Sequence, residues 1–196
     1  MNHRLALLAA LLFAFRLDAA LVEIPDKVRR WQTFTNSTHV PTAYGDGDSF
    51  RVKLGDGREF VFRLGFVDCP ESDKSEPTRN MEQAEFFAVP VGDVPAWGKL
   101  ATEKVRELLA KPFTVHTRWA SALGRSRLPR FYATITTADG KDLGEELLAL
   151  GLAREQGQRM EPPSREKTDD YKRKLRRIEA DAKSSRAGIW SGTLPK

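Results

Sequence analysis

Cysteine and histidine are scarce in this sequence, and their scarcity excludes two kinds of site. The 196 residues include one cysteine, Cys69, so the chain cannot form an internal disulfide bond. They include three histidines, none of them near the cysteine in the sequence, so no cluster of cysteine and histidine suggests a zinc site. The sequence also contains no internal repeat, which excludes an array of tandem modules.

Long apolar runs are equally rare, and the one at the start of the chain is short. It extends from Leu5 to Phe15 after the positive charge of Arg4, and it is shorter than the roughly 20 residues of a membrane-spanning helix. A short positive segment before such a run is typical of secretory signal peptides. We therefore predict a signal peptide over residues 1–20, cut near Ala19 or Ala20, and a secreted or periplasmic protein. The alternative is that this segment stays uncleaved and anchors the protein.

The overall composition is that of a globular protein with a basic surface. Hydrophobic residues make up 40% of the chain and charged residues 30%, and the length suits one domain with a leader. The formal net charge is +5 at pH 7. This balance favours polyanionic partners such as nucleic acid, although a solvated basic face without any partner gives the same balance.

The most regular pattern in the sequence is a β-hairpin over residues 49–67. Apolar and polar residues alternate on both sides of Gly55-Asp56-Gly57, which is typical of two antiparallel strands joined by a tight turn. The alternating apolar residues are Phe50, Val52 and Leu54 before the turn and Phe60, Phe62, Leu64 and Phe66 after it.

Acidic residues stand at both ends of this hairpin. Asp46 and Asp48 precede the first strand, and Asp68 and Glu71 follow the second. Because a hairpin brings its two ends side by side, we expect the four carboxylates to converge, where they repel one another unless a cation lies among them. Carboxylate oxygens without a cluster of histidine or cysteine suit Ca²⁺ or Mg²⁺. Taken alone, Asp46-Gly47-Asp48 is also a common turn sequence, and Arg63 is expected either to pair with these acids or to bind an anion beside them.

Two segments of this region resemble the staphylococcal nuclease (thermonuclease) family. The family pattern is Asp-Gly-Asp-Thr, a hairpin, and then Arg-Leu-x-x-Val-Asp-x-Pro-Glu. The matching segments here are Asp46-Gly47-Asp48-Ser49 and the run from Arg63 to Glu71, Arg-Leu-Gly-Phe-Val-Asp-Cys-Pro-Glu. The resemblance covers about residues 40–191, with residues 72–96 longer than in the smallest family members.

The resemblance implies an α+β fold, a five-stranded OB-fold β-barrel with about three main α-helices. It divides the chain after the signal peptide into an N-terminal extension at 21–39, the nuclease-like domain at 40–191 and a tail at 192–196. The patterns of apolar residues predict strands over 34–42, 113–119 and 130–137, and helices over 81–87, 97–110, 142–153 and 164–187.

The resemblance also assigns roles to the residues at the hairpin ends. It implies that Asp48, Asp68 and the backbone carbonyl of Cys69 hold one Ca²⁺, and that Asp46 orients these ligands or their waters. It implies that Glu71 acts as the general base.

Arg63 and a second arginine are then the groups that bind the phosphate, and two candidates compete for the second position. Gly124-Arg125 keeps the family's Gly-Arg dipeptide, whereas Arg130 keeps the spacing to the following strand. Because position in a strand fixes the direction of a side chain, we favour Arg130 and retain Arg125 as the alternative.

The function that follows from the resemblance is a secreted, Ca²⁺-dependent nuclease that acts on DNA and RNA. By analogy with the family it is an endonuclease that leaves 3′-phosphates, and we expect it to be a monomer. The alternative is a non-catalytic OB-fold protein that only binds nucleic acid. Every acidic and cationic position of the family pattern has a candidate in this sequence, which favours the enzyme.

Overall fold

The computed structural model describes residues 30–43, 45–124, 126–158 and 160–195. The predicted signal peptide at 1–20 and the alternative arginine, Arg125, lie outside these residues.

Five strands form a sheet that closes on itself, because β1 pairs with both β2 and β5. The strand order is β1-β2-β3-β6-β5, and β3 runs parallel to β6 while the other neighbours are antiparallel. The strands are β1 (Gln32–Val40), β2 (Ser49–Lys53), β3 (Glu59–Leu64), β5 (Phe113–Ser121) and β6 (Arg130–Thr136). Since β1 begins at Gln32, the closed sheet includes part of the segment that we assigned to the N-terminal extension at 21–39.

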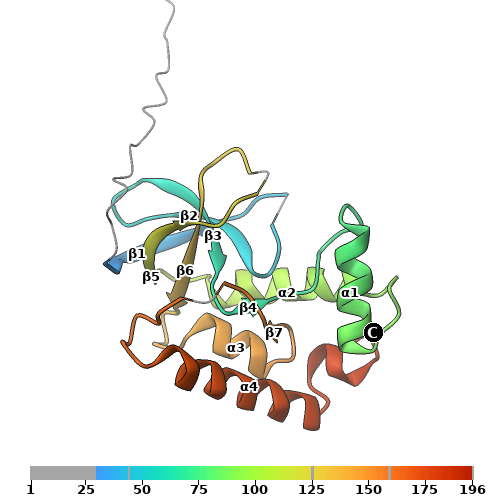
Figure 1. Cartoon of the computed structure of the whole chain (residues 1–196). Helices are drawn as coiled ribbons and strands as arrows, with labels where there is room; N and C mark the ends of the chain where they lie inside the picture. The colour runs from blue at the N-terminus through green and yellow to red at the C-terminus, as the bar shows by residue number, and fades with distance from the viewer. Residues whose placement is uncertain (1–29, 44, 125, 159, 196) are drawn as a thin grey trace, which may run out of the picture.

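Helices gather to one side of the closed sheet, with α4 at the outer edge of the molecule and α1 beside the C-terminus (Figure 1). They are α1 (Pro77–Phe87), α2 (Val94–Leu108), α3 (Leu143–Ala149) and α4 (Thr168–Ser184), followed by the 3₁₀ turn η1 (Gly188–Ser191). The expected α+β class with a five-stranded sheet is confirmed, and α1 is present in addition to the three main helices. No helix in the described part of the chain is long and apolar enough to cross a membrane.

The hairpin of β2 and β3 forms in the register that its apolar pattern requires. Phe50 lies opposite Phe62, and both side chains are buried in the core. The pairing continues past the end of β2, because the Leu64 amide donates to the Asp48 carbonyl over 2.8 Å. Gly57 turns the hairpin with a φ of +89°, which glycine adopts without strain. The two acidic ends of the hairpin therefore lie next to each other.

A second, two-stranded sheet pairs β4 (Val67–Asp68) with β7 (Arg154–Glu155). Asp68 lies opposite Arg154 in this register. Strands of two residues carry no apolar alternation, and this pair was not predicted from the sequence. It brings Arg154, 86 positions after Asp68 in the sequence, to the end of the hairpin.

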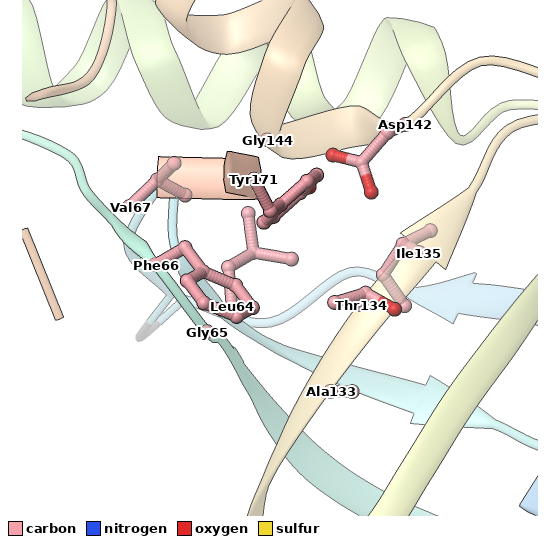
Figure 2. Close-up of a pocket in the computed structure, with 10 residues that line it drawn as sticks. All are labelled: Leu64, Gly65, Phe66, Val67, Ala133, Thr134, Ile135, Asp142, Gly144 and Tyr171. Atoms are coloured by element: carbon pink, nitrogen blue, oxygen red, sulfur yellow. The ribbon is translucent and has the colours of Figure 1, made fainter. Parts of the chain in front are cut away.

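A small cavity separates the end of β3 from β6, α3 and α4 (Figure 2). Its volume of about 10 Å³ is close to the minimum that one water molecule needs, so the cavity is too small for a substrate. In Figure 2 the Asp142 carboxyl group and the Tyr171 ring are both directed toward the space between the ribbons. Asp142 is the N-cap of α3, and its side chain accepts a hydrogen bond from the Glu145 amide over 3.0 Å.

Burial raises the pKa of Asp142 from 3.8 to about 6, and this shift gives a prediction for stability. Because the folded state holds this proton more tightly than the unfolded state, the contribution of Asp142 to stability should be greatest below pH 4 and be lost as the pH rises through 6. Asparagine does not titrate and is an equally good N-cap. The free energy of unfolding of the wild type, relative to Asp142→Asn, should therefore fall by about 2–3 kcal/mol between pH 4 and pH 7.

Urea denaturation of both proteins at the two pH values measures this difference. Asp139→Asn, at an exposed position in the preceding turn, is the matched control and should show no such change. A difference between wild type and Asp142→Asn that is the same at both pH values contradicts the assigned pKa.

Candidate active site

The two buried acids, Asp48 and Asp68, are joined by one arginine at the open end of the hairpin. Both residues are 2% exposed. The Nη2 atom of Arg63 lies 3.0 Å from Asp48 Oδ2 and 3.0 Å from Asp68 Oδ1. A single guanidinium nitrogen therefore bridges the acid before the first strand and the acid after the second. Of the two alternatives for Arg63, the ion pair with these acids is the one present in this structure.

The close packing of this region explains the glycine between Asp46 and Asp48. A Cβ atom at Gly47 would lie 2.8 Å from the Ala101 Cβ of α2 and 2.9 Å from the sulfur of Cys69. These distances are shorter than carbon contacts allow, so a side chain at this position would push α2 or the 68–71 segment away.

The main chain after Asp68 contributes to the same cluster. The Cys69 amide donates to Asp48 Oδ2 over 3.2 Å, which ties the two ends of the hairpin together a second time. The Cys69 thiol is buried, and burial raises its pKa, so the side chain is no nucleophile here. The Cys69 carbonyl, the group that the resemblance assigns to the ion, accepts a hydrogen bond from Gln83 over 2.9 Å.

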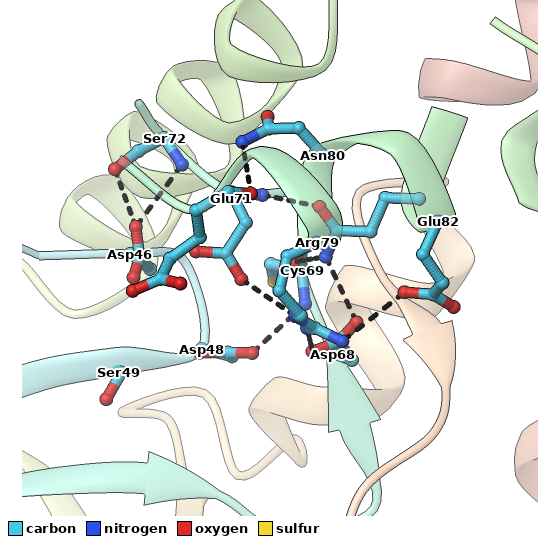
Figure 3. A network of polar contacts seen from close by, with 12 residues as sticks. Asp46, Asp48, Ser49, Asp68, Cys69, Glu71, Ser72, Arg79, Asn80 and Glu82 are labelled. Atoms are coloured by element: carbon cyan, nitrogen blue, oxygen red, sulfur yellow. Dashed lines mark hydrogen bonds and ion pairs between the residues drawn. The ribbon is translucent and has the colours of Figure 1, made fainter. Parts of the chain in front are cut away.

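Asp46 lies at the edge of the cluster, beside Ser72 (Figure 3). Its Oδ1 atom accepts hydrogen bonds from the Ser72 hydroxyl over 2.6 Å and from the Ser72 amide over 3.3 Å. Asp46 thus holds the residue that follows Glu71 close to the start of the hairpin. This contact is compatible with the role that the resemblance implies for Asp46, which is to orient the ligands of the ion or their waters.

Arg79 is a site residue that the sequence analysis missed. It lies on α1, and its Nη2 atom is 2.5 Å from Asp68 Oδ1 while its Nε atom is 3.2 Å from Glu71 Oε1. A third nitrogen, Nη1, is 3.4 Å from Glu82 Oε2. An arginine on a polar helix usually faces solvent, so nothing in the local sequence distinguished Arg79 from its neighbours.

Arg154 was missed as well, and it is the largest fully buried side chain among the described residues. Its Nε atom lies 2.9 Å from Asp68 Oδ2, and Nη1 and Nη2 each lie 2.6 Å from a Glu82 oxygen. The guanidinium carbon is 4.8 Å from the centre of the Phe86 ring. Asp68 is therefore surrounded by three arginines, each from a different element.

Arg130 begins β6 and lies beside the start of β2. Its Nη1 atom is 3.4 Å from the Ser49 hydroxyl, and its Nη2 atom donates to the Ala122 carbonyl over 3.0 Å and to the Leu123 carbonyl. Its Nε atom is buried and has no hydrogen-bond partner. Burial and the nearby charge of Arg63 lower the pKa of Arg130, while Asp48 opposes this shift, so Arg130 lies within electrostatic range of the acids.

Burial changes the acidity of the carboxyl groups at this site. It raises the pKa of Asp48 from 3.8 to about 7, and the charge of Arg63 only partly offsets this effect. Burial is also the main cause of the raised pKa of Glu71, followed by the negative charge of Asp46, whereas Arg79 opposes the shift. A carboxylate with a raised pKa is a better proton acceptor, as a general base requires.

The oxygen atoms present fit a hard divalent cation, with one condition. Asp48 Oδ1 is buried without a hydrogen-bond partner, and the Cys69 carbonyl keeps one lone pair, so both can accept a cation. Asp68 receives four donors, two on each oxygen, so Arg63 or Arg79 must first release Oδ1. Among the described residues no three side chains of the His, Cys, Asp and Glu types converge closely enough to hold a metal. A cation bound by these oxygens would therefore need water and substrate oxygens to complete its shell, as at many Ca²⁺ and Mg²⁺ sites.

A family model described as "Staphylococcal nuclease homologue" matches residues 61–192, more than half of the chain. The matched range begins in β3 and ends after η1. It includes Arg63, Asp68 and Glu71, whereas Asp48 precedes it. No curated protein matches the chain.

Proposed function

Since this chain belongs to the family of staphylococcal nuclease homologues, we propose that it is a Ca²⁺-dependent nuclease that hydrolyses phosphodiester bonds of DNA and RNA. The observation that carries the proposal is the position of Arg63 Nη2, 3.0 Å from both Asp48 and Asp68. Because of these contacts, a guanidinium, two buried carboxylates and the segment that carries Glu71 lie together at one end of the hairpin.

A calcium ion held by Asp48, Asp68 and the Cys69 carbonyl would polarise a phosphodiester oxygen and offset the charge that develops on it. Arg63 has five N–H donors, and its contacts to the two acids use only Nη2. The remaining donors of its planar fork can bind phosphate oxygens in pairs. Arg130 approaches the same end of the hairpin from β6 and is the second phosphate-binding residue of the proposal.

Glu71 takes a proton from the attacking water in the proposed reaction. The water oxygen forms a bond to phosphorus while the bond from phosphorus to the 5′ oxygen breaks. The 5′ oxygen takes a proton from solvent water and leaves as a hydroxyl group, and Glu71 later returns its proton to solvent. The products are then a 3′-phosphate and a 5′-hydroxyl end, as the resemblance implies. We further propose endonucleolytic cleavage by a monomer that is exported by its leader at 1–20.

Replacement of Glu71 by glutamine tests this proposal most directly. We expect Glu71→Gln to lower kcat on plasmid DNA and on single-stranded RNA by about 10²–10⁴-fold, because a general base usually contributes that much. The Kd for a non-cleavable DNA should stay within about threefold, because the proposal gives Glu71 no direct contact with the phosphate. Turnover with Ca²⁺ and with chelator is measured for both proteins, and Glu103→Gln, an exposed acid on α2, is the matched control.

A second function is favoured by the four donors on Asp68, three arginines and Gln83, which together occupy both oxygens of that carboxylate. A protein in which these contacts persist would bind nucleic acid without cutting it. Binding without cleavage under every condition would establish this alternative. Cleavage that continues in the presence of chelator would instead reject the role of the ion, and the protein would still be a nuclease.

A further inference from the structure

Gln83 is a polar side chain that is completely buried, and all of its described contacts are with the segment that carries the candidate site. Its Oε1 atom accepts the Glu71 amide over 2.8 Å. Its Nε2 atom donates to the Cys69 carbonyl over 2.9 Å and to Asp68 Oδ2 over 3.1 Å. Burying an amide is costly unless its groups are paired, and here each group is paired with residues 68–71.

This segment needs a partner because its own strand is short. β4 ends at Asp68, and the next residues pair with no strand, while Pro70 has no amide hydrogen to donate. In an extended chain the carbonyl of one residue and the amide two residues later point to the same side, as Cys69 and Glu71 do here. The primary amide of Gln83 offers one donor and one acceptor to this pair, as the backbone of a neighbouring strand would.

Helix α1 is anchored to the rest of the protein by buried side chains and ion pairs, so its hydrogen bonds can fix the position of residues 68–71. Ala84 and Phe87 are buried in the core, and Arg79 and Glu82 form ion pairs with Asp68 and Arg154. Figure 3 shows Arg79 and Glu82 directed toward Asp68. Arg79, Glu82, Ala84 and Phe87 all belong to the 72–96 segment, which the resemblance implies is longer than in the smallest family members.

We propose that Gln83 is a positioning residue of the active site, and that helix α1 sets the geometry of the ion's oxygen ligands and of the general base together. The inference rests on the proposed function, because it concerns the same residues. A change at Gln83 releases three groups at once: the Asp68 carboxylate, the Cys69 carbonyl and the backbone of Glu71. A purely structural glutamine would affect stability and leave the affinity for calcium unchanged.

The test compares Gln83→Met with Asn80→Leu in the full protein. Methionine keeps the length of the side chain and removes all three hydrogen bonds. Asn80 is buried one turn earlier on α1 and donates to the Asp73 and Glu76 carbonyls, so its replacement disturbs the helix without touching residues 68–71. Gln83→Asn, which keeps the amide but shortens its reach, serves as the second variant if Gln83→Met does not fold.

Calcium affinity is measured by calorimetry with CaCl₂ alone, and kcat and KM are measured on DNA. We expect Gln83→Met to weaken calcium binding and to lower kcat by 10–100-fold each, since loss of groups that hold metal ligands has effects of this size. KM for DNA should change less than threefold. Asn80→Leu should lower the melting temperature and leave calcium affinity and kcat within threefold of the wild type. Unchanged calcium affinity in Gln83→Met, or equal losses in both variants, would overturn the proposal.

Hydrogen exchange at the Glu71 amide separates this inference from the proposed function. If the wild type neither binds calcium nor cuts nucleic acid, the proposed function fails, and exchange alone then decides whether Gln83 positions the segment. Exchange at Glu71 that is at least tenfold faster in Gln83→Met than in Asn80→Leu supports positioning. Equal exchange in the two variants rejects it.

Discussion

Replacement of Arg63 by lysine is expected to lower kcat by a hundredfold or more, although the positive charge is kept. An ammonium group can lie between Asp48 and Asp68, because one nitrogen of Arg63 already makes both contacts. It cannot also present a planar pair of donors to the phosphate, and loss of one such contact to the developing charge usually costs at least a hundredfold in rate.

Single-turnover rates at saturating calcium and DNA measure this loss in the chemical step. Arg51→Lys is the matched control, because Arg51 lies on the adjacent strand β2, pairs with Glu59 and has no contact with the acids. Its rate should stay within about twofold of the wild type. Near-normal turnover in Arg63→Lys would reject the paired contacts to the phosphate and show that only the positive charge at this position is needed.

Replacement of Arg154 by methionine is expected to lower the free energy of unfolding by about 3 kcal/mol. Arg154 is fully buried and pairs with Asp68 and Glu82, so its removal leaves the buried Asp68 carboxylate with less positive charge to compensate it. Breaking a buried pair on one side typically costs about 3–5 kcal/mol, and the lower value applies because Asp68 keeps Arg63 and Arg79.

Urea denaturation at pH 7 and low salt measures this change. Arg173→Met is the matched control, since Arg173 is an exposed residue of α4 whose partner, Asp170, lies one turn away on the same helix. Such surface pairs contribute about 0.3–0.5 kcal/mol, so the two variants should differ clearly. A loss below about 1 kcal/mol in Arg154→Met would mean that the packing of the stem and the Phe86 ring, not the charge, holds β7 in place.

The parts of the fold that could be predicted from the sequence are those with local patterns. The hairpin followed from apolar alternation around Gly55-Asp56-Gly57, and the observed register pairs the expected residues. Helix starts were less accurate, because α1 begins at Pro77 and α2 at Val94, with Pro95 in its first turn. The helix predicted over 97–110 thus begins earlier than expected, because proline fits the first turn of a helix, where its missing amide hydrogen would have no partner.

The acidic half of the candidate site could likewise be predicted, since Asp48, Asp68 and Arg63 belong to one hairpin. Arg79, Gln83 and Arg154 could not, for a physical reason. The polar face of an isolated helix looks the same whether it meets water or a cluster of acids, so α1 gave no sign of its contacts. Arg154 reaches Asp68 through a strand of two residues, which is too short for any periodic pattern.

The burial of the Cys69 thiol protects it from chemical modification. A sulfhydryl at 2% exposure, with its pKa raised by burial, presents almost no thiolate to oxidants or alkylating reagents while the fold is closed. The proposed export would therefore bring this unpaired cysteine into an oxidising environment without mixed disulfides forming at it. Local opening of the segment around Cys69 would expose the sulfur, so the rate at which a thiol reagent modifies it would measure how often that segment opens.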